Sequence, residues 1–127
     1  MTTLAHGVDL VEVARITEML EKHGPRFLDR CFTEAERADC FVNEKRSDER
    51  LAARFAAKEA ALKALGTGWV DGIAWTDVEV VRLPSGEPTL LVTGRAEQIA
   101  AGRGITGWRV SLSHTATHAM ASVIATG

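Results

Sequence analysis

The stretch from Arg54 to Gly68 constrains this chain most, because it predicts one long helix that carries charge where a helix normally buries apolar side chains. It reads RFAAKEAALKALGTG. At 100° per residue, Glu59 lies about 40° from Phe55 and about 60° from Leu62 on the helix surface. A carboxylate there needs a partner, and the nearest in sequence is Lys63 at i+4. Such a pair is better evidence for a site than for stability.

Composition favours an ordinary globular protein. The chain has 127 residues, of which 46% are hydrophobic and 25% charged, so we expect one domain over residues 1–127. A formal charge of −2 and a pI near 6.1 argue against a general nucleic-acid binder. There is no apolar run of membrane-spanning length, and the start from Met1 to His6 lacks a signal-peptide pattern. We therefore expect a cytoplasmic protein with no membrane partner.

The chain has two cysteines, Cys31 and Cys40. They lie nine residues apart within otherwise helical sequence, with neither a C-x-x-C motif nor a histidine at zinc-finger spacing. We expect both to be free reduced thiols.

The first half of the chain predicts one strand followed by helices. Alternating apolar residues indicate a strand, Gly24-Pro25 and Gly66-Thr67-Gly68 are stop signals, and Thr33 to Glu36 has the spacing of a capping box. Ser47 or Asp48 can cap the long helix after a connection at Lys45 to Asp48. The expected elements are a strand from Leu4 to Val11 and helices over about Val13 to His23, Thr33 to Val42 and Glu49 to Leu65.

The second half changes to strands separated by turn residues. The expected elements are strands over Asp77 to Leu83, Thr89 to Thr93, Trp108 to Ser113 and Ala119 to Ala125, a turn at Pro84 to Pro88, a short helix at Arg95 to Ala101, and a link at His114 to His118. The sequence therefore predicts an α+β fold, with a mostly antiparallel sheet packed against the long helix.

Asp9 and Glu59 are the candidate metal ligands. Asp9 shares a strand face with Gly7 and Val11, although it can also be the cap of the following helix. Two carboxylates on rigid elements suit Mg²⁺ that also binds substrate phosphates. Lys63, one turn beyond Glu59, can supply positive charge where a phosphoryl oxygen becomes negative, or it can simply neutralise Glu59.

Three other features have competing interpretations. His114 can present a donor to a phosphate, whereas the His114 and His118 spacing does not support a zinc site, because the flanks indicate a hairpin. Gly66-Thr67-Gly68 follows a helix and is better explained as its end than as a phosphate loop. Arg15, Met19 and Lys22 form one helical stripe, which is usually a solvated face.

Four ordered segments resemble one known family across nearly the whole chain. They are Gly7-Val8-Asp9-Leu10 running to Arg15-Ile16, Phe32-Thr33 with Glu36, Arg54 to Ala60 with Lys63-Ala64 and Gly66-Thr67-Gly68, and Ser111-Leu112-Ser113-His114-Thr115 with Ala119 and Ala121. Together they resemble the short 4′-phosphopantetheinyl transferases, the holo-(acyl-carrier-protein) synthases. Each motif alone is modest, but the ordered set with K-E-A-x-x-K-A is specific.

The resemblance implies Mg²⁺-dependent transfer of phosphopantetheine from coenzyme A to a serine of an apo acyl carrier protein, with release of 3′,5′-ADP. It implies that Asp9 and Glu59 hold the metal, that Glu59 accepts the serine proton, and that Lys63 stabilises or protonates the leaving phosphate. The coenzyme A contacts that it implies are Lys45, Arg46, Arg54, Lys63, Gly66, His114 and Thr115.

The same resemblance implies two kinds of protein partner. Arg15, Met19 and Lys22, with Arg26 beyond them in a loop of variable spacing, match positions that dock the acidic carrier protein. Short members of the family are trimers with active sites between subunits, so we expect a homotrimer whose clefts are completed near the turn from Pro84 to Pro88.

Two residues depart from the family pattern. His6 is expected beside the metal site, where it can alter the pH response, and Cys31 is expected only to pack.

Two other functions fit some of these residues. A metal-dependent phosphodiesterase built on Asp9, Glu59 and Lys63 would hydrolyse coenzyme A or a nucleotide without a carrier protein. A coenzyme A-binding interaction module would need no leaving-group cation, so Lys63 argues against it.

Overall fold

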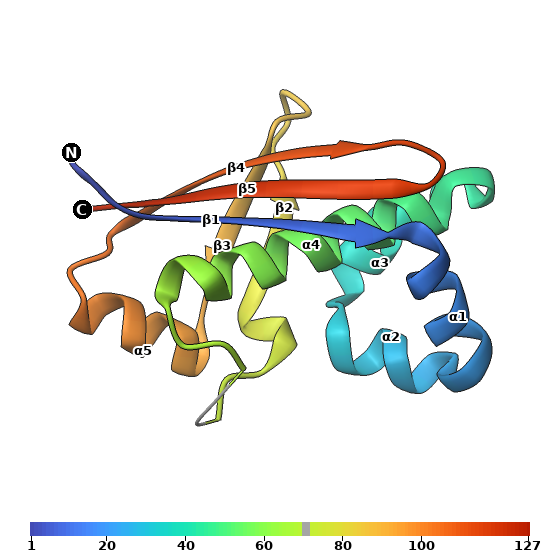
Figure 1. Cartoon of the computed structure of the whole chain (residues 1–127), viewed down its shortest axis with the longest axis horizontal. Helices are drawn as coiled ribbons and strands as arrows, with labels where there is room; N and C mark the ends of the chain where they lie inside the picture. The colour runs from blue at the N-terminus through green and yellow to red at the C-terminus, as the bar shows by residue number, and fades with distance from the viewer. Residues whose placement is uncertain (70–71) are drawn as a thin grey trace.

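The computed structural model describes residues 1–69 and 72–127. A long helix, α4, runs beneath a three-stranded sheet of order β1-β5-β4, and β2 and β3 form a second, two-stranded sheet (Figure 1). Every ladder is antiparallel among these residues, so the predicted α+β fold is confirmed. The elements are β1 (Thr3–Glu12), α1 (Val13–His23), α2 (Pro25–Cys31), α3 (Glu34–Cys40), η1 (Glu44–Arg46), α4 (Ser47–Leu65), η2 (Trp75–Asp77), β2 (Val78–Arg82), β3 (Pro88–Val92), α5 (Gly94–Gly102), β4 (Gly107–His114) and β5 (His118–Thr126).

Helix α4 is buried on nearly all sides, which explains its alanine-rich sequence. Ala52, Ala56 and Ala60 are fully buried, and small side chains let β1 and β5 lie close to the helix. The helix begins two residues earlier than expected, with Arg46 at the N-cap position and no side-chain cap. The predicted cap at Ser47 or Asp48 is therefore wrong, because both lie within the helix and Asp48 accepts a hydrogen bond from Thr17 of α1.

The N-terminal helices differ from expectation at one place. Helix α1 has the predicted bounds, and the capping box at Thr33 and Glu36 is present at the start of α3. The expected loop after Gly24 is instead the helix α2, with Pro25 in its first turn. Proline has a backbone angle already suited to a helix start, so the same Gly-Pro pair ends one helix and begins the next.

The two faces of the three-stranded sheet have different environments. Gly7 and Val11 of β1 are buried against α4, whereas Val8, Leu10 and Met120 are exposed, at 46%, 64% and 46%. Residue side chains alternate between the faces of a strand, so these exposed residues belong to the opposite face. The sheet therefore has one face on the core and one apolar face open to solvent.

Two further expectations concern the chain as a whole. Cys31 and Cys40 are buried and unbonded, as the cysteine spacing predicts. Of the helices in the described part of the chain, none has the length and apolar character needed to span a bilayer.

Candidate active site

Asp9 of β1 and Lys63 of α4 form an ion pair where these two elements pack together. Nζ of Lys63 lies 3.0 Å from Oδ1 of Asp9 and donates a second hydrogen bond of 3.0 Å to the carbonyl oxygen of Val8. The side chain of Asp9 is 15% exposed, whereas that of Lys63 is 55% exposed. The strand continues past Asp9 to Glu12, so the prediction that Asp9 lies on a strand is confirmed and the helix-cap alternative is wrong.

Gly7 permits the close packing of β1 on α4 that brings Asp9 to Lys63. A Cβ added at Gly7 would lie 2.0 Å from the carbonyl oxygen of Ala60 and 2.8 Å from the amide nitrogen of Ala64. Backbone atoms cannot move aside as a flexible side chain can, so only glycine permits β1 to lie this close to α4. Asp9 follows two residues later on the same strand face and is thereby brought to the surface of the helix.

Glu59 lies one turn before Lys63 on α4 and is partly buried. The predicted Glu59–Lys63 ion pair is wrong, since Lys63 pairs with Asp9 instead. Within residues 1–69 and 72–127, the Glu59 side chain has no hydrogen bond or ion pair. The prediction failed because the i+4 rule considers only one helix, whereas Lys63 reaches a neighbouring strand. The result is an uncommitted carboxylate beside a carboxylate–ammonium pair.

The donor set of Asp9 and Glu59 fits a hard divalent cation. Carboxylate oxygens are the ligands that Mg²⁺ prefers, and Mg²⁺ commonly uses one or two of them together with water and substrate phosphates. The described residues contain no cluster of three or more histidine, cysteine or acidic side chains that could hold a metal without such help. A cation at Asp9 and Glu59 would therefore depend on oxygen ligands from a substrate or from water.

His114 lies in a second polar cluster near the start of α4. Nδ1 of His114 is 3.0 Å from Oε1 of Glu49, which occupies the first turn of that helix. The side chains are 32% and 19% exposed. The adjacent turn is ordered by Thr115, whose hydroxyl accepts hydrogen bonds from the amides of Thr117 and His118.

The other candidate phosphate contacts have contrasting environments. Lys45 and Arg46 are exposed in η1, and Gly66 is exposed in the left-handed conformation that ends α4. Arg54 is different because its side chain is only 3% exposed, lies 3.8 Å from the carboxylate of Asp39 and donates to the carbonyl oxygen of Arg50. In this structure Arg54 faces α3 rather than solvent.

A groove lies along α1 and α2, with a volume of about 550 Å³. Arg15, Met19 and Arg26 from the predicted docking set line it, but Lys22 does not and instead pairs with Glu18. Sequence reasoning missed Arg30, which also lines the groove, because α2 was expected to be a loop. Its remaining lining residues are His23, Phe27, Cys31, Phe55 and Trp75.

Aromatic rings are among the residues that line the groove. Phe55 stacks on Trp75 with ring centroids 4.7 Å apart, and the guanidinium of Arg15 lies 5.4 Å from the centroid of the Phe55 ring. A cation over an aromatic face is held in place by the ring quadrupole. The groove is therefore lined by both aromatic rings and arginine side chains.

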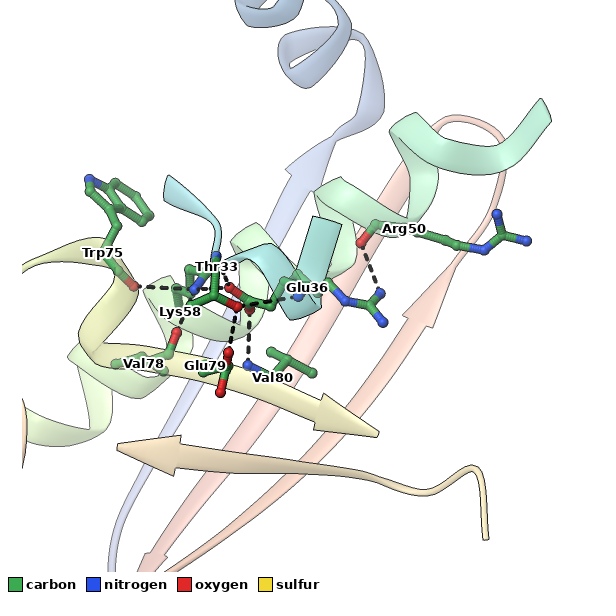
Figure 2. Close-up of polar contacts among 9 residues, drawn as sticks. Thr33, Glu36, Arg50, Lys58, Trp75, Val78, Glu79 and Val80 are labelled. Atoms are coloured by element: carbon green, nitrogen blue, oxygen red, sulfur yellow. Dashed lines mark hydrogen bonds and ion pairs between the residues drawn. The ribbon is translucent and has the colours of Figure 1, made fainter. Parts of the chain in front are cut away.

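The buried pair of Lys58 and Glu36 was missed by sequence reasoning (Figure 2). Nζ of Lys58 donates to Oε1 of Glu36 at 2.8 Å and to the carbonyl oxygens of Trp75 and Val78, while Oε2 of Glu36 accepts from the amide of Val80 at 2.9 Å. Burial lowers the pKa of Lys58, and the Glu36 carboxylate opposes this effect. The capping-box spacing predicted that the Glu36 carboxylate bonds the amide of Thr33, but no sequence signal indicated its burial or its pairing with Lys58.

His6 is not beside Asp9. It lies on the opposite face of β1, where Nε2 is 2.9 Å from the hydroxyl of Ser122. The expectation that His6 lies beside the metal site is therefore wrong, because an odd separation along a strand places two side chains on opposite faces.

The chain is similar to known proteins over nearly its whole length. Residues 5–121 match the family model of the 4'-phosphopantetheinyl transferase superfamily. The holo-[acyl-carrier-protein] synthase of Desulforudis audaxviator is 52% identical over 124 residues, which cover 98% of this chain and 93% of the relative. That of Gloeobacter violaceus is 48% identical over 121 residues, which cover 95% and 91%.

Solved structures are similar as well. The holo-[acyl-carrier-protein] synthase of Neisseria meningitidis is 29% identical, with a TM-score of 0.87 and coverage of 99% of this chain and 100% of that one. The Helicobacter pylori enzyme, solved in complex with coenzyme A, is 26% identical, with a TM-score of 0.83 and coverage of 95% and 99%.

Proposed function

The chain belongs to the 4′-phosphopantetheinyl transferase superfamily, and from this premise we propose that it transfers 4′-phosphopantetheine from coenzyme A to a serine of an apo acyl carrier protein. The observation that carries the proposal is the contact of Lys63 with Asp9, one helical turn from the uncommitted carboxylate of Glu59. This arrangement offers an acceptor for a hydroxyl proton and a cation for a leaving phosphate.

In the reaction, the serine oxygen attacks the phosphorus that carries pantetheine. The bond from this phosphorus to the bridging oxygen of the pyrophosphate breaks, and 3′,5′-ADP leaves with that oxygen. Glu59 accepts the serine proton, directly or through a water. Lys63, whose side chain is 55% exposed, is available to stabilise or protonate the departing phosphate.

Asp9 and Glu59 are the residues that would hold Mg²⁺. When bound there, the ion would neutralise charge on the pyrophosphate oxygens. Lys63 forms an ion pair with Asp9, so the negative charge of the Asp9 carboxylate is balanced before any ligand binds. The chemistry of the two carboxylates supports this assignment.

For coenzyme A we propose contacts from the exposed cations Lys45 and Arg46, from His114 and Thr115, and from the backbone at Gly66. Arg54 would contribute only if its guanidinium left Asp39, so its present burial makes it the weakest member of this set.

The groove along α1 and α2 is the proposed docking surface for the carrier protein. Acyl carrier proteins are acidic, and Arg15, Arg26 and Arg30 supply the complementary charge beside the apolar Met19. Lys22 lies outside the groove in an exposed pair with Glu18, so we assign it a peripheral role.

We also propose that the protein assembles as a trimer with active sites between subunits. The open sheet face, which bears Val8, Leu10 and Met120, supports an interface between copies of this chain, because exposed apolar residues on one face mark interaction surfaces. The turn between β2 and β3 would then complete a neighbour's cleft.

The buried, unbonded thiols of Cys31 and Cys40 support placing the reaction in the reducing cytoplasm.

The test is to incubate the protein with Mg²⁺, coenzyme A and an apo acyl carrier protein, and to measure the intact mass of the carrier. We expect a gain of one phosphopantetheine group that requires both the metal and the protein. Loss of coenzyme A with an unmodified carrier would overturn the proposal in favour of a phosphodiesterase. If several carriers stay unmodified and coenzyme A is bound but intact, the protein is a binding module.

A further inference from the structure

Glu49 contacts His114 in a way that determines which nitrogen of the imidazole can meet a ligand. Oε1 of Glu49 lies 3.0 Å from Nδ1 of His114. An ionised carboxylate can only accept a hydrogen bond, so Nδ1 must carry the proton. Nε2 is then the ring nitrogen left for a substrate group.

The position of Glu49 is itself constrained. It lies in the first turn of α4, and its side chain is 19% exposed. The next residue, Arg50, donates hydrogen bonds to the carbonyl oxygens of Cys40 and Asn43, and the preceding residue, Asp48, accepts one from Thr17. These contacts hold the first turn of α4 against α1 and α3, so Glu49 has a fixed base from which to orient the ring.

Glu49 is too far from Asp9 and Glu59 to serve as another metal ligand. Ten residues separate it from Glu59 on the same helix, which corresponds to about 15 Å along the axis at 1.5 Å per residue. Its role must therefore be sought at His114, where the strand β4 ends.

We propose that Glu49 is a positioning residue that accepts a hydrogen bond from Nδ1–H of His114 and so leaves Nε2 facing a phosphate of coenzyme A, to which Nε2–H donates when the ring carries both protons. This inference rests on the proposed function, because it assumes that His114 contacts that substrate. A carboxylate behind an imidazole fixes ring orientation and compensates positive charge on the ring when Nε2 donates to an anion. The carboxylate touches neither the substrate nor the reacting phosphorus.

The test compares Glu49→Ala and Glu49→Gln with Asp48→Asn. Asp48→Asn is the matched control, because it removes a negative charge from the same helical turn without touching His114. For Glu49→Ala we expect the KM for coenzyme A and the Kd for 3′,5′-ADP to rise about 10-fold or more, with the KM for the carrier protein little changed. Glu49→Gln keeps an accepting oxygen and should lie between Glu49→Ala and the wild type.

A spectroscopic measurement separates positioning from a structural role. Nitrogen-15 NMR, with His114 assigned by comparison with His114→Gln, should show the Nδ1–H tautomer in the wild type and a shift toward Nε2–H in Glu49→Ala. Equal KM and Kd values for Glu49→Ala and Asp48→Asn, or an unchanged tautomer in Glu49→Ala, would overturn the inference. The tautomer is measured without substrate, so a wild-type protein that fails to modify carriers refutes the proposed function separately.

Discussion

Lys63 and Asp9 form an ion pair of 3.0 Å between α4 and β1, although 54 residues separate them in sequence. The ammonium also donates to the carbonyl oxygen of Val8, so two groups of one strand fix its position. The pair places a cation beside the carboxylate that we assign to the metal. Chemistry at this site therefore depends on how closely β1 packs against α4.

The first prediction concerns the two carboxylates. Asp9→Ala and Glu59→Gln should each lower kcat by about 100-fold or more, because the first removes an oxygen ligand and the second removes the negative charge and the proton acceptor. Circular dichroism should show an unchanged fold, and the exposed Glu97→Gln on α5 serves as the control. Normal turnover by Glu59→Gln would refute its metal and base roles.

Lys63→Ala should separate metal binding from catalysis. Without the ammonium, Asp9 loses a competing cation, so Mn²⁺ should bind at least as tightly as in the wild type. Turnover should fall by about 100-fold because the leaving phosphate has no cation. Paramagnetic relaxation and steady-state kinetics measure the two effects, and weaker Mn²⁺ binding with normal kcat would contradict this role for Lys63.

Gly7→Ala should disturb the site through backbone packing alone. The new Cβ would collide with the backbone of Ala60, so β1 must shift away from α4, at a cost of about 1–3 kcal/mol or more in unfolding free energy. Because Asp9 lies on the displaced strand, kcat should also fall. Gly102→Ala is the matched control, since a Cβ there meets nothing within 4 Å. Urea denaturation and kinetics test both effects, and equal stability of the two variants would contradict the close approach.

The buried thiols should make the protein less stable in alkali. Burial raises the pKa of both Cys31 and Cys40 to about 11, from a usual value of 9.0. Their contribution is complete below pH 9 and is lost as the pH rises toward 11, because the unfolded chain releases these protons first.

This contribution can be isolated with the double variant Cys31→Ala/Cys40→Ala. The difference in unfolding free energy between wild type and variant should shrink by up to about 2–3 kcal/mol per thiol across that range. Effects of groups that do not interact with the thiols cancel in the difference, whereas Lys58 interacts with Cys31 through its charge and adds to the measured pH dependence. A constant difference would show that the thiols ionise alike in both states.

Charge reversal on α1 should distinguish residues that line the groove from those outside it. Arg15→Glu should raise the KM for the carrier protein by about 10-fold or more and leave that for coenzyme A unchanged, because it places a carboxylate against an acidic partner. Lys22→Glu should have a smaller effect, since Lys22 lies outside the groove. Equal effects of Arg15→Glu on both substrates would remove the docking assignment.

The sequence by itself determined most of the secondary structure and the family. Apolar periodicity, the capping box at Thr33 and Glu36, and the stop signals at Gly24 and Gly66 are local, so they predicted element bounds to within a few residues. The ordered motifs around Asp9, Glu59 and His114 predicted the family that the comparisons confirm. Helix α2 was not predicted, because Pro25 was interpreted only as the end of the preceding helix and not as the start of a new one.

Only the tertiary structure determined which charged side chains form pairs. The periodicity of one helix suggested Lys63 as the partner of Glu59, but the strand at Gly7 passes close enough for Lys63 to reach Asp9. In the same way, Lys58 pairs with Glu36 inside the core, and His114 with Glu49. Local patterns specify which residues share a helix or strand face, whereas pairing between charged groups depends on distances that arise only when separate elements pack together.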